Sequence, residues 1–420
     1  MIAYEQALAL ILADTPTQAI EAVALDRAVG RVLAAAVRSE VALPGFDNSA
    51  MDGFALASGG RVLPAGLEVD VVGAQAAGDG RVAGDCGAFE IMTGARLPDG
   101  LDSVVPVEQV EVLVRAGDGR PRRIRLLAEL PPGQHIRRAG EDIALGQTVL
   151  PAGTRLAANE VMLLAAIGQG QVMVRQRPRV ALIATGRELV DDPALALEPG
   201  QIRNSNGPYL AAGMRIAGAE LVHRETVGDN PDDFLAAIGR ALAAGAELLI
   251  STGAVSMGRY DFVPAALARI GAEARFHKVA IRPGKPLLYA RLAGGQQFFG
   301  LPGNPVSTAV GLRFFVEPAL RAQLGMAPET PLTVPLAAPL KKKPGLQHFL
   351  KAVLGPDRQG QLQVKVLAGQ ESFRILPLVA ANAWAMVSAA GGDLAASERV
   401  SVYALSHGAG WTVKETMDAG

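Results

Sequence analysis

The residues best suited to chemistry lie in short loops that combine Gly or Pro with charged or hydroxyl side chains. Three of these loops, Thr185–Glu188, Ser251–Gly253 and Pro302–Asn304, each follow an apolar run in the second half of the chain. Glycines allow backbone N–H groups to approach an anion closely. Three cations, Lys278, Arg282 and Lys285, lie within eight positions of one another, and such side chains bind phosphate and related oxyanions. The pattern predicts an oxyanion-binding site.

Several common catalytic motifs are excluded. Lys285 is followed by Pro286, so the Gly-rich segment before it is not a phosphate-binding P-loop. No His-Glu-x-x-His pair occurs. The segment Gly253–Gly258 has one residue too many for the nucleophile elbow of a serine hydrolase. Cys86 is the only cysteine, which excludes an intrachain disulfide and a cysteine-based zinc site.

The elements that must position these loops alternate between strand and helix. Apolar runs at Val180–Ala184, Leu221–Val222 and Leu248–Ile250 predict buried strands. Helical patterns separate or follow them, over 208–217, 231–244 and 263–270. This alternation predicts a doubly wound parallel sheet. Ligands bind such sheets beyond the carboxyl ends of the strands, where the three loops fall.

The flanking segments predict further domains, because 420 residues exceed what one core usually supports. We expect a multidomain α/β plus β protein with a discontinuous N-terminal helical or linker domain (1–44 and 135–176), an inserted β-rich domain (45–134), a doubly wound α/β domain (177–326) and a small C-terminal β-barrel-like domain (327–420). We also expect the helix at 160–167 to pack with N-terminal helices within 1–40.

Charge and hydropathy restrict the partners. Forty basic residues oppose 41 acidic ones, giving a net charge of −1, which provides no general field for nucleic acid or an anionic membrane. The basic run Lys341–Lys343 is interpreted as a solvated loop. No apolar run approaches the ~18–20 residues needed to cross a bilayer, and no signal peptide is apparent. We therefore expect a cytoplasmic protein with no nucleic-acid or membrane partner.

Four distinctive segments occur in this order: Pro44–Gly53, Gly140–Asp142, Arg282–Pro286 and Gly300–Ser307. Through them the chain resembles the MoeA family of molybdopterin molybdenumtransferases, which includes the E-domain of gephyrin. The resemblance runs from about residue 43 to 310. It implies a MogA/MoeA-type central domain and insertion of molybdate into adenylyl-molybdopterin, with Mg²⁺-dependent release of AMP, to give the molybdenum cofactor. It also implies a homodimer, a MogA-like adenylyltransferase as partner, and molybdoenzymes as acceptors of the product.

The resemblance also assigns residues. The positions implied for catalysis are Asp52, Thr93, Asp142, Glu188, Asp229 and Asp261, of which Asp52, Glu188 and Asp261 would bind Mg²⁺. The positions expected to bind the pterin and the oxyanion are Thr185, Gly186, Ser251, Gly253, Ser256, Gly258, Lys278, Arg282, Lys285, Pro302, Gly303, Asn304, Pro305 and Ser307. Taken singly, several of them have a plainer local interpretation, because Asp52–Gly53 suits a turn and Asp229 or Asn230 suits a helix cap.

Three departures from the family pattern bear on activity. Arg187 replaces the acid of Thr-Gly-Asp-Glu, Ala254 replaces the second glycine of Gly-Gly-Val-Ser, and Arg203 lies in a changed Asp-Thr-Asn segment. Arg282 stands in place of the first lysine of the family's Lys-Pro-Gly-Lys segment and keeps the positive charge. These changes leave open a pterin-binding scaffold paralogue that has lost turnover. A third alternative is an unrelated sugar- or nucleotide-phosphate enzyme on the same architecture.

Overall fold

The computed structural model describes residues 1–84, 86–255 and 262–407. The chain divides into two compact units. One comprises 1–34, 152–156 and the chain from 172 onward, and the other comprises 35–151 and 157–171. Each unit has hydrophobic cores of its own.

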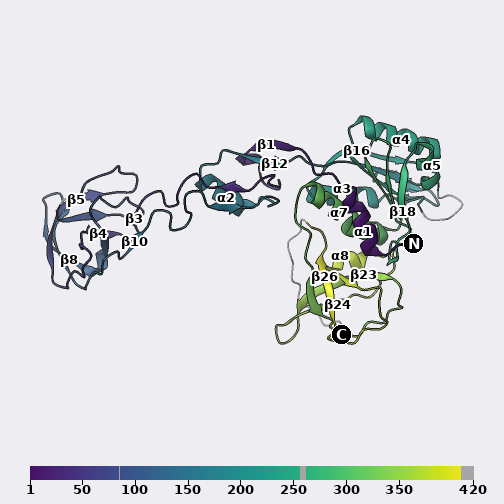
Figure 1. Cartoon of the computed structure of the whole chain (residues 1–420). Helices are drawn as coiled ribbons and strands as arrows, with labels where there is room; N and C mark the ends of the chain where they lie inside the picture. Colours follow the sequence, from purple (N-terminus) through teal and green to yellow (C-terminus); the bar gives the residue numbers. More distant parts are fainter. Residues whose placement is uncertain (85, 256–261, 408–420) are drawn as a thin grey trace. The chain divides into compact units, whose positions relative to one another are not determined.

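The first unit contains a six-stranded sheet in the order β16-β13-β17-β21-β20-β18 (Figure 1). The first four of these strands are parallel neighbours and the last two pair antiparallel. Their bounds are β13 (Arg179–Thr185), β16 (Glu220–Val227), β17 (Leu248–Thr252), β18 (Glu273–His277), β20 (Leu288–Arg291) and β21 (Gln297–Leu301). The predicted doubly wound parallel sheet is thus confirmed for four strands. The turn from 292 to 296 joins β20 to β21 and is too short for a parallel crossover.

Helices cover both faces of this sheet. Along β13, Val180 and Leu182 belong to one core, whereas Ala181 and Ile183 belong to the other, as expected where successive side chains alternate between faces. The first core is shared with α1 (Tyr4–Ala13), α3 (Asn206–Ile216) and the continuous run of α6 (Pro305–Gly311), the π-helical turn η3 (Leu312–Val316) and α7 (Glu317–Gln323). The second core is shared with α4 (Pro231–Ala243) and α5 (Val263–Arg269).

The N-terminal segment differs from its prediction. Only Tyr4–Ala13 is α-helical, and the chain then forms β1 (Ile20–Ala24) and the 3₁₀ turn η1 (Leu25–Arg27), with β1 paired to β12 (Gln171–Arg175). Pro16 prevents the helix from continuing. Helix α1 contacts α7 and buries Tyr4 and Ile11 in the α/β core. The expected packing of an N-terminal helix with the helix near 160–167 stays a prediction.

The second unit is β-rich, as predicted. Its main sheet has the order β7-β4-β6-β5-β9-β8. The bounds are β4 (Gly53–Leu56), β5 (Glu68–Gln75), β6 (Ala88–Ile91), β7 (Ser103–Pro106), the 3₁₀ turn η2 (Val107–Gln109), β8 (Val110–Arg115) and β9 (Pro121–Leu126). Shorter elements are β2 (Val37–Arg38), β3 (Asn48–Ser49), β10 (Ile136–Arg137), β11 (Thr148–Leu150) and α2 (Ala158–Ala166). Strand β4 was not predicted, because Gly53 begins it directly after a loop-like segment.

The C-terminal part is a curved sheet, in agreement with the barrel-like prediction. Its order is β19-β23-β25-β26-β22, and β24 also pairs with β23. A bridge between Leu336 and Val364 connects the chain after β22 to β24 and closes the barrel-like layer. The bounds are β19 (Ile281–Arg282), β22 (Leu332–Pro335), β23 (Gln347–Pro356), β24 (Leu362–Val366), α8 (Leu376–Ala380), β25 (Ala383–Val387) and β26 (Arg399–Ala404).

A buried group of charges lies where the π-helical turn meets α7. Arg313 is 1% exposed and donates two hydrogen bonds to the Glu329 carboxylate at 2.7 and 2.8 Å. Its Nη1 lies 3.6 Å from the carboxylate of Glu317, which also accepts a bond from the His407 backbone N–H. Burial raises the pKa of Glu317 to about 7, against the lowering effect of Arg313.

Within residues 1–84, 86–255 and 262–407, no helix combines the length and the hydropathy required to cross a membrane.

Candidate functional site

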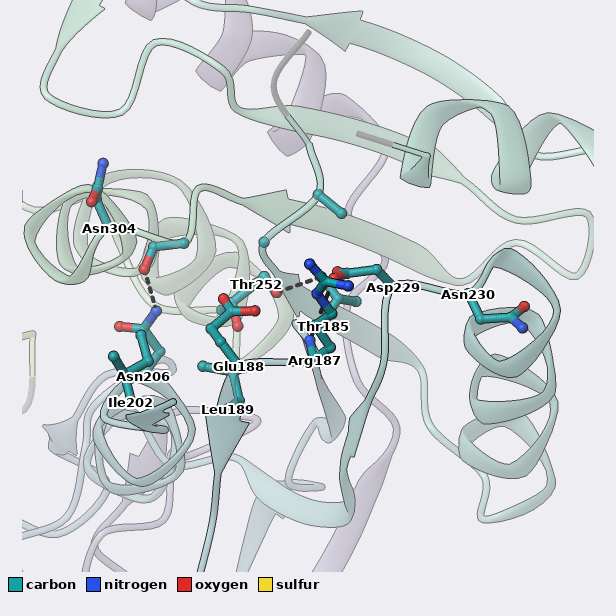
Figure 2. A pocket seen from close by; sticks show the side chains of 13 residues that line it. Thr185, Arg187, Glu188, Leu189, Ile202, Asn206, Asp229, Asn230, Thr252 and Asn304 are labelled. Atoms are coloured by element: carbon teal, nitrogen blue, oxygen red, sulfur yellow. Dashed lines mark hydrogen bonds between the residues drawn. The ribbon is translucent and has the colours of Figure 1, made fainter. Parts of the chain in front are cut away.

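The carboxyl ends of four parallel strands meet at one edge of the α/β sheet. Thr185 at the end of β13 pairs with Val227 at the end of β16, and Thr252 at the end of β17 pairs with Leu301 at the end of β21. The loops that follow these ends surround a cavity of about 780 Å³ (Figure 2). Its lining consists of Thr185, Arg187, Glu188, Leu189, Ile202, Asn206, Asp229, Asn230, Thr252, Gly253, Ala254, Gly303 and Asn304.

Glycine is required at two places in this rim. Gly253 has φ +92°, and a Cβ there would lie 2.6 Å from the Thr185 carbonyl oxygen. Gly186 has φ +149°, and a Cβ there would lie 2.7 Å from the Glu188 carboxylate. Both conformations disfavour L side chains. At Gly253 the backbones of two neighbouring loops therefore approach more closely than a side chain would permit, whereas at Gly186 a Cβ would meet the flexible Glu188 side chain of the same loop.

Polar side chains fix the loops to one another. The Asn206 amide donates to the Gly303 carbonyl oxygen at 2.7 Å, and the Thr185 hydroxyl donates to the Thr252 carbonyl oxygen at 3.1 Å (Figure 2). Asn204 accepts from the Gly207 N–H at 2.9 Å and so begins α3. Thr252 lies in the predicted rim loop Ser251–Gly253, whereas Asn206 was not predicted as a pocket residue. The run Asn204–Asn206 ahead of a helix and the hydroxyls at the end of β17 were the signals available for them.

The charges in the lining come from two adjacent loops. Glu188 and Asp229 are the carboxylates and Arg187 is the cation. The Asp229 carboxylate accepts from the Arg187 backbone N–H at 3.4 Å. Asn230 caps α4 by accepting from the Asp232 N–H at 2.8 Å, and Figure 2 shows its side chain pointing away from that of Asp229. Because Asn230 caps the helix, Asp229 is left to line the cavity.

Six of the predicted positions line this cavity: Thr185, Glu188, Asp229, Gly253, Gly303 and Asn304. Others lie behind the wall. Ser251 is 0% exposed, and its hydroxyl has no hydrogen-bond partner among the described residues. Ser307 is buried within α6. Pro302 and Pro305 shape the loop before α6, where the Pro302 carbonyl oxygen accepts from the Thr308 hydroxyl at 2.7 Å.

The predicted cations do not line the cavity. Arg282 lies on β19, which pairs in parallel with β23 of the C-terminal sheet, opposite His348. Lys285 is exposed and Lys278 has a left-handed backbone, with φ +75°. Burial, followed by the charges of Arg282 and Lys342, lowers the pKa of His348. These basic groups therefore form a second polar region, and their role in oxyanion binding stays a prediction.

The interpretation of Lys341–Lys343 as a solvated loop is wrong for its central residue. Lys342 is 6% exposed, and its ammonium group donates to the carbonyl oxygens of Ala390 and Gly391, each at 3.3 Å. The turn that follows β25 thus binds the cation through its backbone, a contact that local sequence does not reveal.

Three predicted catalytic residues belong to the β-rich unit. The Asp52 carboxylate accepts from the Thr93 backbone N–H at 2.7 Å, and the Asp142 N–H donates to the Leu43 carbonyl oxygen at 3.0 Å. All three side chains, those of Asp52, Thr93 and Asp142, are exposed. Three further predicted residues, Ser256, Gly258 and Asp261, lie outside the described residues.

The described residues contain no group of three or more His, Cys, Asp or Glu side chains that could hold a metal ion. Of the expected Mg²⁺ ligands, Glu188 lines the cavity, and Asp261 lies outside the described residues.

Together, these features define a multidomain α/β protein with a ligand cavity at the strand ends of its central domain. Residues 181–322 match the probable molybdopterin binding domain. Residues 2–168 match the MoeA N-terminal region (domain I and II), and 333–405 match the MoeA C-terminal region (domain IV).

Relatives extend this similarity along the whole chain. A molybdopterin molybdenumtransferase of Synechococcus elongatus is 40% identical over 414 residues, which cover 96% of this chain and 100% of the relative. One of Bacillus subtilis is 36% identical, covering 87% and 85%. The crystal structure of the molybdopterin biosynthesis MoeA protein of Pyrococcus horikoshii is similar with a TM-score of 0.80 at 27% identity, covering 96% and 99%. The chain belongs to the MoeA family of molybdopterin molybdenumtransferases.

Proposed function

We propose that this protein inserts molybdate into adenylyl-molybdopterin and releases AMP and the molybdenum cofactor. The adenylylated pterin would occupy the cavity at the strand ends, and molybdate would bind near Lys278, Arg282 and Lys285. The observation that carries the proposal is the convergence of four parallel strand ends on one polar cavity, within the segment that matches the molybdopterin-binding domain.

The cavity suits such a substrate in size and lining. Its volume of about 780 Å³ falls in the upper range of ligand pockets, ~300–1,000 Å³. Gly253 and Gly303 add no side chain to the lining, and Asn206 and Asn304 contribute polar amides to it. No protein nucleophile is needed, since an oxygen of water or molybdate would attack the diphosphate, AMP would leave, and positioning and charge neutralisation support this cleavage of a phosphoanhydride.

Glu188, a predicted Mg²⁺ ligand, lines the cavity together with a second carboxylate, Asp229, and would hold a magnesium ion that is shared with substrate phosphates. Mg²⁺ is usually bound by one or two carboxylates together with phosphate oxygens, so a complete cage of protein ligands is not required. When bound, the ion would offset diphosphate charge and polarise the bond to be cleaved. Asp52 and Asp261 stay predicted ligands.

The test is AMP release. Wild-type protein mixed with adenylyl-molybdopterin, molybdate and Mg²⁺ should produce AMP, quantified by liquid chromatography. Glu188→Gln should slow release by roughly tenfold or more, because it removes a charge from the cavity. Glu198→Gln, on an exposed loop outside the lining, is the matched control. Folded wild-type protein that releases no AMP would refute the proposal.

A scaffold paralogue that binds the pterin without turnover is the second candidate. It is favoured by Arg187, which lines the cavity where the family pattern has an acid. The distinguishing result is pterin affinity without AMP release, with activity gained by Arg187→Asp. The third alternative, an unrelated sugar- or nucleotide-phosphate enzyme, is contradicted by the family membership of the chain.

The expected assembly is also part of the proposal. We expect a homodimer, transfer of the adenylylated substrate from a MogA-like adenylyltransferase, and delivery of the product to molybdoenzymes. Sedimentation of the purified protein tests the first expectation, and co-purification with the adenylyltransferase tests the second. A cytoplasmic location stays a prediction.

A further inference from the structure

The two carboxylates in the cavity lining disfavour an anionic ligand, and one cation in the lining offsets their charge. Glu188 and Asp229 contribute two negative charges to the lining. Among the lining residues that the structure describes, Arg187 is the only cation. An adenylylated pterin carries phosphate groups, and two carboxylates alone would repel it.

The Arg187 guanidinium is available to a ligand. No carboxylate of the described residues lies within ion-pair distance of it, and the described chain provides it with no hydrogen-bond acceptor. The residue is exposed at the cavity wall. Arg203, at another departure from the family pattern, differs in this respect. Its guanidinium donates to the carbonyl oxygens of Asp192 at 2.7 Å and of Leu195.

The backbone that carries Arg187 is held in place. Its N–H donates to the Asp229 carboxylate at 3.4 Å, and the turn is closed by the Leu189 N–H, which donates to the Gly186 carbonyl oxygen at 3.2 Å. Gly186 itself adopts a conformation that only glycine favours. The guanidinium therefore extends from a fixed point in the same cavity lining as the two carboxylates, those of Glu188 and Asp229 (Figure 2).

We propose that Arg187 is a specificity-determining residue that binds the diphosphate oxygens of the substrate through its guanidinium. This inference rests on the proposed function, because that function supplies a diphosphate ligand. A planar guanidinium donates two parallel hydrogen bonds to adjacent oxygens and keeps its charge at all physiological pH values. It neutralises charge without a metal ion, so this chain binds diphosphate in the absence of Mg²⁺.

Calorimetric titration with ADP in the presence of EDTA tests the inference, with AMP as the monophosphate arm. Arg187→Ser should weaken ADP binding by about tenfold to a hundredfold, the usual effect of losing charge-assisted hydrogen bonds, and should weaken AMP binding less. Arg187→Lys should lose less affinity than Arg187→Ser, because it keeps the charge. Arg203→Ser is the matched control and should bind as the wild type does.

Three results would overturn any role of Arg187 in binding ADP, and a fourth would overturn its diphosphate role. These are wild-type protein that does not bind ADP in EDTA, Arg187→Ser with wild-type affinity, and an equal loss in Arg203→Ser. Equal losses for ADP and AMP would assign Arg187 to a single phosphate and would overturn its diphosphate role. The assay is separate from AMP release. Wild-type protein that binds ADP through Arg187 but releases no AMP refutes the proposed function and leaves the role of Arg187 standing.

Discussion

Replacing Gly253 by Ala tests whether the cavity depends on close approach of two backbones. The new methyl group would lie 2.6 Å from the Thr185 carbonyl oxygen and 2.7 Å from its hydroxyl, at φ +92°. The left-handed conformation costs about 1–2 kcal/mol for Ala. Displacing Thr185 adds about 1 kcal/mol for its hydrogen bond to Thr252, and overpacking adds about 1–2 kcal/mol more. The expected loss is about 3–5 kcal/mol of unfolding free energy.

Thermal unfolding followed by circular dichroism measures this loss. At about 2 °C per kcal/mol for a unit of this size, Gly253→Ala should lower the transition temperature of the α/β unit by about 6–10 °C. Gly271→Ala is the control, because Gly271 also has a left-handed backbone, φ +70°, but a Cβ there meets no atom within 4 Å. It should lose only about 2–4 °C. Equal losses in the two variants would show that the contact with Thr185 is not what requires glycine.

Two further changes test other parts of the same unit. Ala254 has φ +50°, so Ala254→Gly should raise the transition temperature by about 1–2 °C. The control is Ala244→Gly, at φ −74°, which should lower the transition temperature. A lower transition temperature in both variants would contradict the strain at Ala254. Burial raises the pKa of Glu317 from 4.5 to about 7, so the folded state binds an additional proton between these values. This contribution is complete below pH 4.5 and is lost as the pH rises through 7. Relative to Glu317→Gln, wild-type protein should therefore lose about 3 kcal/mol of unfolding free energy between pH 4.5 and 8, measured by denaturant unfolding. Parallel pH profiles of the two proteins would show that Glu317 does not cause the pH dependence of stability.

The sequence was sufficient to predict the elements with a clear hydrophobic period and the loops that follow the strand ends. Alternating strands and helices between 180 and 270 predicted a doubly wound sheet, and each cavity loop follows a predicted strand or apolar run. The same local patterns could not identify β4, because Gly53 is compatible with a turn as well as with a central strand. Its position is decided by pairing with β6 and β7, which are distant in sequence.

Side-chain partners were least predictable from sequence. Lys342 appeared in a basic run that is typical of solvated loops, yet backbone carbonyl groups from a later turn bury it. Asn206 carried no sign that it would reach the Gly303 carbonyl oxygen. Such contacts depend on which loops meet in three dimensions, and a local period contains no information about that.

The cavity is formed mainly by backbone geometry, which explains how this chain can keep the family architecture while two lining side chains differ. Gly253 allows the close approach of the Thr185 loop, and both Gly253 and Gly186 have a φ that disfavours other residues. Position 187 presents its side chain on that framework, whereas Ala254 has a left-handed φ of +50°. A change from acid to base at 187 therefore alters the charge that a ligand meets without altering the walls. The charge that the side chain at 187 adds to the lining is thus separate from the glycine conformations that shape the loops.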